Sequence, residues 1–426
     1  MTNKQCMLII GSQYGDEGKG KFTDILADEY DYIVRFQGGD NAGHSIVIDG
    51  VKYKLRLIPS GIFKSSKKTV IGHGVVVNPK TLIREIKYLK ENGFDVKNRL
   101  FVSNRAHIIT DYHIAIDKYY EDLKGADKVG TTLCGIGPCY SDKIQRVGIR
   151  TSDLLDKNEL KNKIILSLRT KRDLLPHIGF SMADVQRLVN EYYALGQQIK
   201  PYISNTIDLL NKAYHDGKKI LFEGAQGTFL DIDMGTYPYV TSSSTVAGVS
   251  SGSGISVTKI NSVLSIVKAY TSRVGEGPFI AEIFGKTADY IRERGGEYGT
   301  VTKRPRRIGW LDLVMLKYAV NVVGTTEIAL TLLDVLSGLK EIKVCIAYKY
   351  KNKTISEILP NNKEYAKCKP IYKTFKGWTE DITTIKTFQQ LPKNAQIYID
   401  FLSKELDVPI TYISVGNDRI RTIRKG

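Results

Sequence analysis

Residues 13–21 read Gln-Tyr-Gly-Asp-Glu-Gly-Lys-Gly-Lys, and this glycine-rich stretch lies between an apolar run and a helical pattern. The apolar run, residues 6–10, predicts a short buried strand. Phe22, Ile25 and Leu26 recur at helical spacing and predict the helix that follows. A strand, a glycine-rich loop and a helix N-terminus together present N–H groups that bind phosphate. The stretch therefore predicts a phosphate site, with a generic glycine-rich turn as the simpler alternative.

The loop differs from the Walker A motif of many nucleotide-binding proteins. Gln13 stands where that motif has its first glycine, and Gly20 stands where it has a serine or threonine. Because the hydroxyl group that usually binds Mg²⁺ is missing, we expect Asp16, an acidic residue inside the loop, to take its place.

A second glycine-rich loop follows the next predicted strand. Residues 32–36 form an apolar run, and residues 37–44 read Gln-Gly-Gly-Asp-Asn-Ala-Gly-His. In a parallel sheet, the tip of this loop lies at the same carboxyl edge as the first loop, so the two loops face one crevice. We therefore expect Asp16 and His44 to share a site, as a base and as an acid or electrostatic partner for phosphoryl transfer. A structural or surface-exposed histidine is the alternative for His44.

The remaining chain alternates predicted strands with helical stretches. Apolar runs predict strands at residues 100–103, 220–222, 263–267, 328–332 and 410–414. A helix over residues 79–92 is indicated by Asn78 as its cap and Gly93 beyond its last turn. Residues 46–48 and 51–53 flank Asp49-Gly50, which predicts a hairpin. The fold class predicted is α/β: a large, mostly parallel central sheet flanked by helices, similar to P-loop NTPases with a variant phosphate loop, plus small antiparallel appendages.

Residues 241–254 are rich in serine and glycine, which is typical of a flexible linker. Val246, Val249 and the sharp preceding segment, residues 235–240, favour an ordered functional loop instead. No other segment indicates a domain boundary, so we expect residues 1–426 to form a single domain.

The composition is that of a soluble globular protein, with 42% hydrophobic and 25% charged residues. Lys and Arg exceed Asp and Glu by 62 to 45, and the formal charge of +17 attracts nucleic acid or small phosphates. The basic cluster at residues 303–307 is short and adjoins an apolar segment, which favours small phosphates.

The five scattered cysteines form no CxxC pair and support neither disulfides nor a zinc site. With no signal peptide or membrane-spanning run, we expect a cytoplasmic protein.

Two segments resemble the signatures of the adenylosuccinate synthetase family. Residues 13–20 match the first signature except at Tyr14, where the family usually has tryptophan, and residues 135–146 match the second. The likeness covers essentially the whole chain, through residues 37–39, 41–44, 222–228, 231–233, 235–243, 304–310 and 414–416. It implies a ligase that uses GTP to join L-aspartate to IMP, giving adenylosuccinate, GDP and phosphate through a 6-phosphoryl-IMP intermediate. This reaction is the first committed step from IMP to AMP.

The resemblance also implies which residues form the site. The catalytic residues would be Asp16, which takes the N1 proton of IMP, His44, which stabilises the transferring phosphoryl group, Lys19 and Gln226. The GTP-binding residues would be Gly15, Asp16, Glu17, Gly18, Lys19, Gly20, Lys21, Gly43, His44, Ser45, Arg306, Leu332, Leu333, Asp334, Ser414, Val415 and Gly416. The IMP-binding residues would be Asp16, Glu17, Gly18, Lys19, Asn41, Ala42, Gly43, His44, Thr132, Arg146, Gln226, Thr241 and Arg304. The aspartate-binding residues would be Thr300, Val301, Thr302, Lys303, Arg304, Pro305 and Arg306.

The resemblance further implies one Mg²⁺ held by Asp16 and the carbonyl of Gly43, and a homodimer in which Arg146 reaches IMP across the interface. From its spacing alone, Arg146 is a solvated surface residue. Arg304 and Arg306 suit aspartate because guanidinium groups bind carboxylates through two parallel hydrogen bonds. Asp334 can accept hydrogen bonds from guanine N1–H and its amine, which adenine does not offer.

Three positions depart from the family pattern. Leu332 replaces a lysine whose stem packs on guanine, Leu133-Cys134 replaces a basic residue beside Thr132, and Pro305 replaces an arginine. We therefore expect an active enzyme with altered substrate affinities. Two other classes stay open from sequence: a basic nucleic-acid-binding protein without catalysis, and an ATP-dependent ligase with another acceptor.

Overall fold

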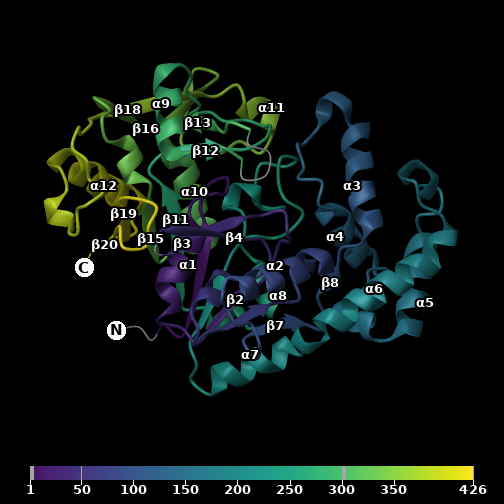
Figure 1. Ribbon diagram of the computed structural model, residues 1–426. Coiled ribbons are helices and arrows are strands. Elements are labelled where there is room, and N and C mark those ends of the chain that lie inside the picture. The colour runs from purple at the N-terminus through teal and green to yellow at the C-terminus, as the bar shows by residue number, and fades with distance from the viewer. Residues whose placement is uncertain (1–3, 49, 300–303, 426) are drawn as a thin grey trace.

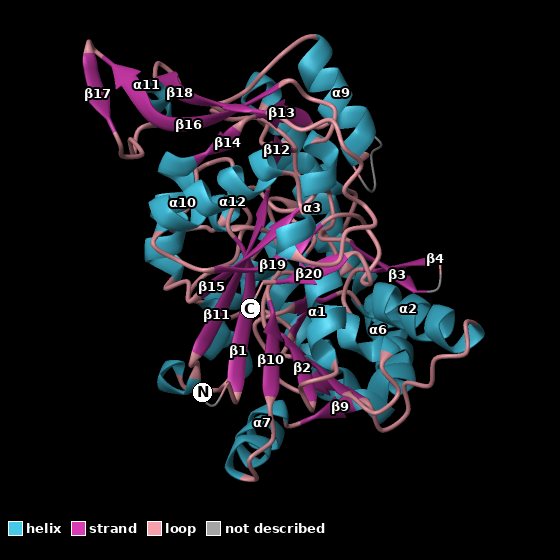
Figure 2. Cartoon of the chain, turned by 90° about the vertical axis from the view of Figure 1, so that its left-hand side faces the viewer, coloured by secondary structure: helices cyan, strands magenta, loops and turns pink. Residues whose placement is uncertain are grey.

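A ten-stranded sheet forms the centre of the computed structural model, which describes residues 4–48, 50–299 and 304–425 (Figures 1 and 2). The strand order is β20-β19-β15-β11-β1-β10-β2-β5-β7-β9, and only the β19–β20 pair is antiparallel. Its strands are β1 Cys6–Gly11, β2 Tyr32–Arg35, β5 Lys68–Ile71, β7 Leu100–Ser103, β9 Ile203–Ser204, β10 Ile220–Glu223, β11 Ser262–Lys268, β15 Glu327–Thr331, β19 Ile410–Ser414 and β20 Thr422–Arg424. The predicted mostly parallel sheet is confirmed.

The central strands are buried along their whole length, as expected where helices cover both faces of a parallel sheet. Every residue of β1, β11 and β15 is buried. The strand predicted at residues 328–332 ends one residue early, because Leu332 has a left-handed backbone with φ 57°. This turn directs the chain away from the sheet edge into the residues that follow.

Helices surround the sheet and form two further groups on either side of it. Figure 1 shows α3 to α6 on the right and α9, α12 and the strands β16 and β18 towards the upper left. The helices are α1 Lys19–Ala27, α2 Pro79–Glu91, α3 Asp111–Leu123, α4 Ile136–Gln145, α5 Lys157–Arg169, α6 Val185–Ile199, α7 Thr206–His215, α8 Gly248–Ser253, α9 Lys286–Gly295, α10 Leu313–Val323, α11 Asn362–Tyr365 and α12 Lys393–Leu406. Phe22 and Leu26 of α1 pack into one core cluster with Met7 and Ile9 of β1.

Smaller sheets lie around this framework, and the antiparallel pairs among them are the predicted appendages. Their strands are β3 His44–Ile48 with β4 Val51–Leu55, β6 Val76–Val77 with β8 His107–Ile108, β12 Thr271–Arg273 with β13 Arg307–Gly309, and β14 Leu311–Asp312 with β16 Glu341–Tyr350, β17 Lys353–Ile355 and β18 Lys369–Lys376. The β3–β4 pair is the predicted hairpin, and Gly50 has φ 79° in its turn.

Local sequence signals placed several boundaries correctly. The side chain of Asn78 accepts hydrogen bonds from the N–H groups of Lys80 and Thr81, so it caps α2 as predicted. The segment 241–254 contains α8 and buries Val246 and Val249 in the core, so it is an ordered loop and the linker interpretation is wrong. Across the described ranges, no helix is both long and apolar enough to span a membrane.

Candidate active site

The carboxyl edge of the parallel sheet brings together loops from distant parts of the sequence. The segments after β1, β2 and β10 meet around Gln226. A Cβ placed on Gly38 would lie 3.3 Å from Gln226 Oε1, and one placed on Gly15 would lie 3.7 Å from Gln226 Cα. The first and second glycine-rich loops therefore meet at this edge, where the sequence predicts a shared crevice.

The first loop is shaped by the buried carboxylate of Glu17. Its Oε1 accepts hydrogen bonds from the N–H groups of Gly15 (2.8 Å) and Gln13 (3.2 Å), and its Oε2 pairs with Lys19 Nζ at 2.5 Å. Left-handed backbones at Gly15, Asp16 and Gly18 turn the loop, with φ 86°, 58° and 94°. No side chain of the described residues caps the helix that starts at Lys19. Its N-terminal N–H groups are thus available to a phosphate.

Asp16 and Arg306 meet at the mouth of this loop. Arg306 Nη2 lies 2.8 Å from Asp16 Oδ2, and the Asp16 side chain is 36% exposed while that of Arg306 is 10% exposed. The opposite charges of the two groups attract each other across this contact. Because its side chain is partly exposed, Asp16 is accessible to a substrate, although its Oδ2 pairs with Arg306 in this structure.

His44 lies against the start of α1. A Cβ placed on Gly20 would be 3.3 Å from His44 Cβ, and His44 Nε2 is 3.0 Å from the carbonyl oxygen of Ile58. Burial lowers the pKa of His44, although the charge of Glu223 acts in the opposite direction. Because a carbonyl only accepts, the neutral ring carries its proton on Nε2, and Nδ1 has no proton to donate. A phosphoryl group would receive a hydrogen bond from Nδ1 only after the ring gains a second proton.

Buried polar atoms without partners mark the region where the loops converge. Gln226 Nε2 donates to Asn41 Oδ1 at 3.3 Å, but Gln226 Oε1 and Thr241 Oγ1 have no hydrogen-bond partner among the described residues. Buried oxygens of this kind are normally satisfied. A polar ligand bound here would give both oxygens a hydrogen-bond donor.

A second polar region lies beyond β15 and β19. Lys21 Nζ donates to Ser414 Oγ and to the carbonyl oxygen of Gly416, both at 2.7 Å. Burial lowers the pKa of Lys21 to about 7 and raises the pKa of Asp334. Asp334 Oδ1 is buried and has no partner within the described ranges. The structure thus brings Lys21, Asp334, Ser414 and Gly416 to one end of the crevice, and the neighbouring Leu333 and Val415 are buried in the core.

Other predicted site residues lie apart from Asp16 and His44. Thr132 and Arg146 are exposed, and no hydrogen bond or ion pair joins either of them to the loops in the described chain. Arg146 follows the last turn of α4 with φ 66°. Residues 300–303, which include Thr300, Val301, Thr302 and Lys303, lie outside the described residues. The flanking residues are described, and the N–H of Gly299 donates to the carbonyl of Arg304 at 2.8 Å.

Sequence reasoning missed a buried charge network behind the first loop. Glu297 accepts from Lys268 Nζ (2.7 Å), from the hydroxyl of Tyr270 (2.6 Å) and from Arg306 Nη1 (2.7 Å). Lys268, Tyr270 and Glu297 are isolated among unrelated neighbours in the sequence, so no local pattern pointed to them, whereas Arg306 was already a predicted site residue. Lys268 in particular ends an apolar strand, where the fold brings it opposite Glu297.

Tyr14, the departure in the first signature, is accommodated by packing. Its ring centre lies 5.6 Å from that of Phe229 and 5.9 Å from that of Phe279, and the guanidinium of Arg273 lies 4.3 Å from it. These contacts satisfy the ring on several sides. Tyr14 is smaller than the tryptophan usual in the family, but these contacts still support the loop.

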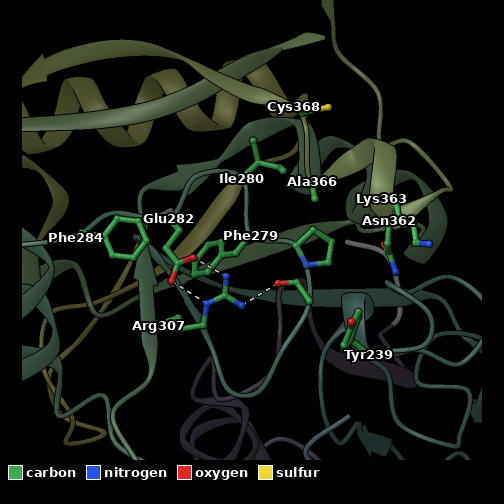
Figure 3. Close-up of a pocket in the computed structure, with 12 residues that line it drawn as sticks. Tyr239, Phe279, Ile280, Glu282, Phe284, Arg307, Asn362, Lys363, Ala366 and Cys368 are labelled. Carbon is green, nitrogen blue, oxygen red and sulfur yellow. Dashed lines mark hydrogen bonds and ion pairs between the residues drawn. The ribbon is translucent and has the colours of Figure 1, made fainter. Parts of the chain in front are cut away.

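A separate cavity of about 600 Å³ lies next to Phe279 and Arg307 (Figure 3). Arg307 spans part of it, pairing with Glu282 and donating to the carbonyl of Gly277 at 2.8 Å. Neither Asp16 nor His44 lines this cavity. The crevice with the unpartnered polar atoms, rather than this cavity, is therefore the better candidate for catalysis.

Comparison with known proteins gives one consistent result. The family model for adenylosuccinate synthetase matches residues 8–423. The adenylosuccinate synthetase of Malacoplasma penetrans is 54% identical over 424 residues, covering 99% of both chains, and that of Listeria innocua is 52% identical over 98% of this chain and 97% of its own. The structure of fully ligated adenylosuccinate synthetase from Plasmodium falciparum matches with a TM-score of 0.94 and 41% identity, over 99% of this chain and 100% of that chain. A cyanophage S-2L succinoaminodeoxyadenylate synthetase, with a TM-score of 0.63 and 19% identity over 99% of this chain and 95% of its own, shares the fold.

Proposed function

The chain belongs to the adenylosuccinate synthetase family and is a GTP-dependent ligase that joins L-aspartate to IMP, and from this premise we propose how its residues divide the work. The family assignment overturns both alternatives left open by the sequence, the nucleic-acid-binding protein without catalysis and the ATP-dependent ligase. What remains to be assigned is the role of each side chain, the metal ion and the assembly.

In the proposed mechanism, Asp16 takes the N1 proton of IMP, and the electron pair shifts to O6, which attacks the γ-phosphate of GTP and releases GDP. The amine of aspartate then attacks C6 and expels phosphate. The exposure of Asp16 beside an uncapped helix N-terminus supports this role, since the base must reach both a purine and a phosphate. Lys19 and the N–H groups of α1 offset the charge that builds on the phosphates.

The observation that carries the site assignment is the position of three buried oxygens without partners. Gln226 Oε1 and Thr241 Oγ1 lie where IMP is proposed to bind, and Asp334 Oδ1 lies where guanine is proposed to bind. All three can accept hydrogen bonds from purine donors. Glu17 keeps its loop in shape, and Arg304 and Arg306 supply the cations proposed to bind aspartate.

One Mg²⁺ is proposed at Asp16 and the carbonyl oxygen of Gly43. No group of three or more His, Cys, Asp and Glu side chains forms a metal site in the described part of the chain. This fits Mg²⁺, which usually takes one or two carboxylates and completes its shell with water and substrate phosphates. When bound, the ion would neutralise charge on the transferring phosphoryl group.

We expect adenylosuccinate formation only when IMP, aspartate, GTP and Mg²⁺ are all present. Removing Mg²⁺ with a chelator should lower the rate by at least about 10²-fold, because the phosphate charge is then uncompensated. The rate is followed by the ultraviolet absorbance of the product, omitting each component in turn. An undiminished rate without Mg²⁺ would sink the metal assignment while leaving the ligase activity in place.

We propose a cytoplasmic homodimer in which Arg146 completes the IMP site of the partner, with residues 1–426 acting as one domain. The exposure of Arg146 at the end of α4 supports donation to a second copy, since no side-chain hydrogen bond or ion pair joins it to another described residue. Arg146→Ala and Asp16→Asn subunits should each be nearly inactive alone. Mixing them in equal amounts and allowing subunit exchange should restore about a quarter of wild-type activity, because half the dimers are hybrids with one intact site. If each site used Arg146 of its own subunit, mixing the two variants would restore no activity.

A further inference from the structure

The charges behind Asp16 alternate in sign along one connected network, from Lys268 through Glu297 and Arg306 to Asp16. Side-chain exposure rises along the same path, from 1% for Lys268 and Glu297 to 10% for Arg306 and 36% for Asp16. The network therefore runs from the protein interior to the mouth of the site.

Glu297 holds Arg306 at two points. Its carboxylate accepts from Arg306 Nη1 at 2.7 Å, and its backbone carbonyl accepts from the N–H of Arg306 at 2.9 Å. Tyr298 and Pro305 form a bridge just beyond this pair. Glu297 and Arg306 thus face each other next to this bridge, and Arg306 is one of the residues proposed to bind aspartate.

The guanidinium of Arg306 has one buried N–H without an acceptor among the described residues. Glu297 takes Nη1, Nη2 contacts Asp16 Oδ2, and Nε–H has no acceptor in the described chain. Nη2 and Nε lie on the same edge of the group, which is an edge that binds a carboxylate through two parallel hydrogen bonds. In this structure Asp16 pairs with Nη2 alone, and Nε–H has no acceptor among the described residues.

A gain in protein stability does not by itself explain why Glu297 and its cationic partners are buried. Burial would raise the pKa of Glu297, but Lys268 and Arg306 bring it down to about 2, so the group is ionised at neutral pH. Desolvating a buried ion pair usually costs as much as the pair returns, and apolar residues of similar volume would serve as well. A fixed orientation of Arg306 is something that apolar residues cannot provide.

We propose that Glu297 is a positioning residue, which fixes Arg306 so that its Nη2 and Nε edge receives a carboxylate of substrate aspartate and releases Asp16 for its own role. Lys268 and Tyr270 hold Glu297 in turn. This inference rests on the proposed assignment of Arg306 to aspartate.

Glu297→Gln tests the proposal, because glutamine keeps the size of the side chain but presents an uncharged amide to Arg306. The KM for aspartate should rise about tenfold or more, while the KM for IMP changes by less than about threefold. Tyr270→Phe removes one hydrogen bond to Glu297 and should shift the aspartate KM in the same direction, by about two- to fivefold. If Glu297→Gln does not fold, Tyr270→Phe still tests the proposal.

Glu327→Gln is the matched control. Glu327 is also buried and paired with a lysine, Lys4, but it starts β15 at the opposite edge of the sheet from the site. The KM values for aspartate, IMP and GTP should all stay at wild-type levels in this variant. A purely structural role for Glu297 would instead move the three KM values together and lower the melting temperature.

A double-mutant cycle separates the possible failures. If Glu297 acts through Arg306, adding Glu297→Gln to Arg306→Lys should change the aspartate KM by less than about twofold, whereas independent effects would multiply. An unchanged aspartate KM in Glu297→Gln, beside a raised one in Arg306→Lys, overturns the positioning role alone. An unchanged aspartate KM in Arg306→Lys overturns the assignment of Arg306 to aspartate as well.

Discussion

Replacing Asp16 by asparagine should lower kcat by roughly 10³-fold, since general-base catalysis of this kind contributes about 10²- to 10⁴-fold. Asparagine has the same shape as aspartate but takes up no proton from IMP and provides a poorer ligand for Mg²⁺. The variant also loses the ion pair with Arg306, which is 2.8 Å long in the wild-type structure. Steady-state rates at saturating substrates measure the effect.

Binding should be affected far less than catalysis. The Kd of IMP, measured by calorimetry, is expected to change by no more than about threefold, because most of the proposed IMP contacts come from other residues. Asp28→Asn is a suitable control, since Asp28 is an exposed aspartate just after α1 that pairs with Lys64. It should retain wild-type activity. If the Asp16 variant kept more than about a tenth of the wild-type kcat, another group would have to be the base.

The architecture of the site was predictable because its signals are local. The strands before the first and second loops are short apolar runs, and the glycines and the helix start follow each other directly in the sequence. Parallel pairing then places both loops at one edge. The predictions of the α2 cap and the hairpin turn were correct for the same reason, since each depends on two or three adjacent residues.

The contacts within the site were not predictable in the same way. Arg306 appeared in the sequence as part of an exposed basic cluster, yet it is mostly buried between Asp16 and Glu297. Lys268 and Glu297 carry no pattern, because their partnership depends on how β11 and the segment after α9 come together. Arg146 gave no physical signal at all, and only the family resemblance singled it out.

The structure also shows what Leu332, one of the departures from the family pattern, does in this protein. Leu332 turns the chain out of β15 with a left-handed backbone, and it packs against the core. Asp334 follows two residues later with a buried oxygen that lacks a partner. We therefore propose that recognition of guanine depends on the carboxylate of Asp334 more than on a side chain stacked over the base.

Asp334→Asn should consequently lower kcat/KM for GTP by roughly 10²-fold, because the new amide opposes an N–H donor of guanine where the carboxylate accepted one. At saturating GTP, kcat should fall much less, since contacts with the base are the same in the ground and transition states. Competition assays between nucleoside triphosphates measure the change. Asp400→Asn, on the exposed side of α12 where Asp400 pairs with Lys425, is the control and should behave as wild type.

Xanthosine triphosphate distinguishes lost recognition from a damaged pocket. Xanthine has a carbonyl where guanine has its exocyclic amine, so it opposes the carboxylate of Asp334 but complements the amide of an asparagine. The ratio of kcat/KM for the xanthine and guanine nucleotides should therefore rise by at least about 10²-fold in Asp334→Asn. A loss that is equal for both nucleotides would mean that Asp334 supports the shape of the pocket and does not read the base. If Asp334→Asn prefers the xanthine nucleotide over the guanine nucleotide, guanine specificity depends on the carboxylate of Asp334, which lies in the same region as Lys21 and Ser414.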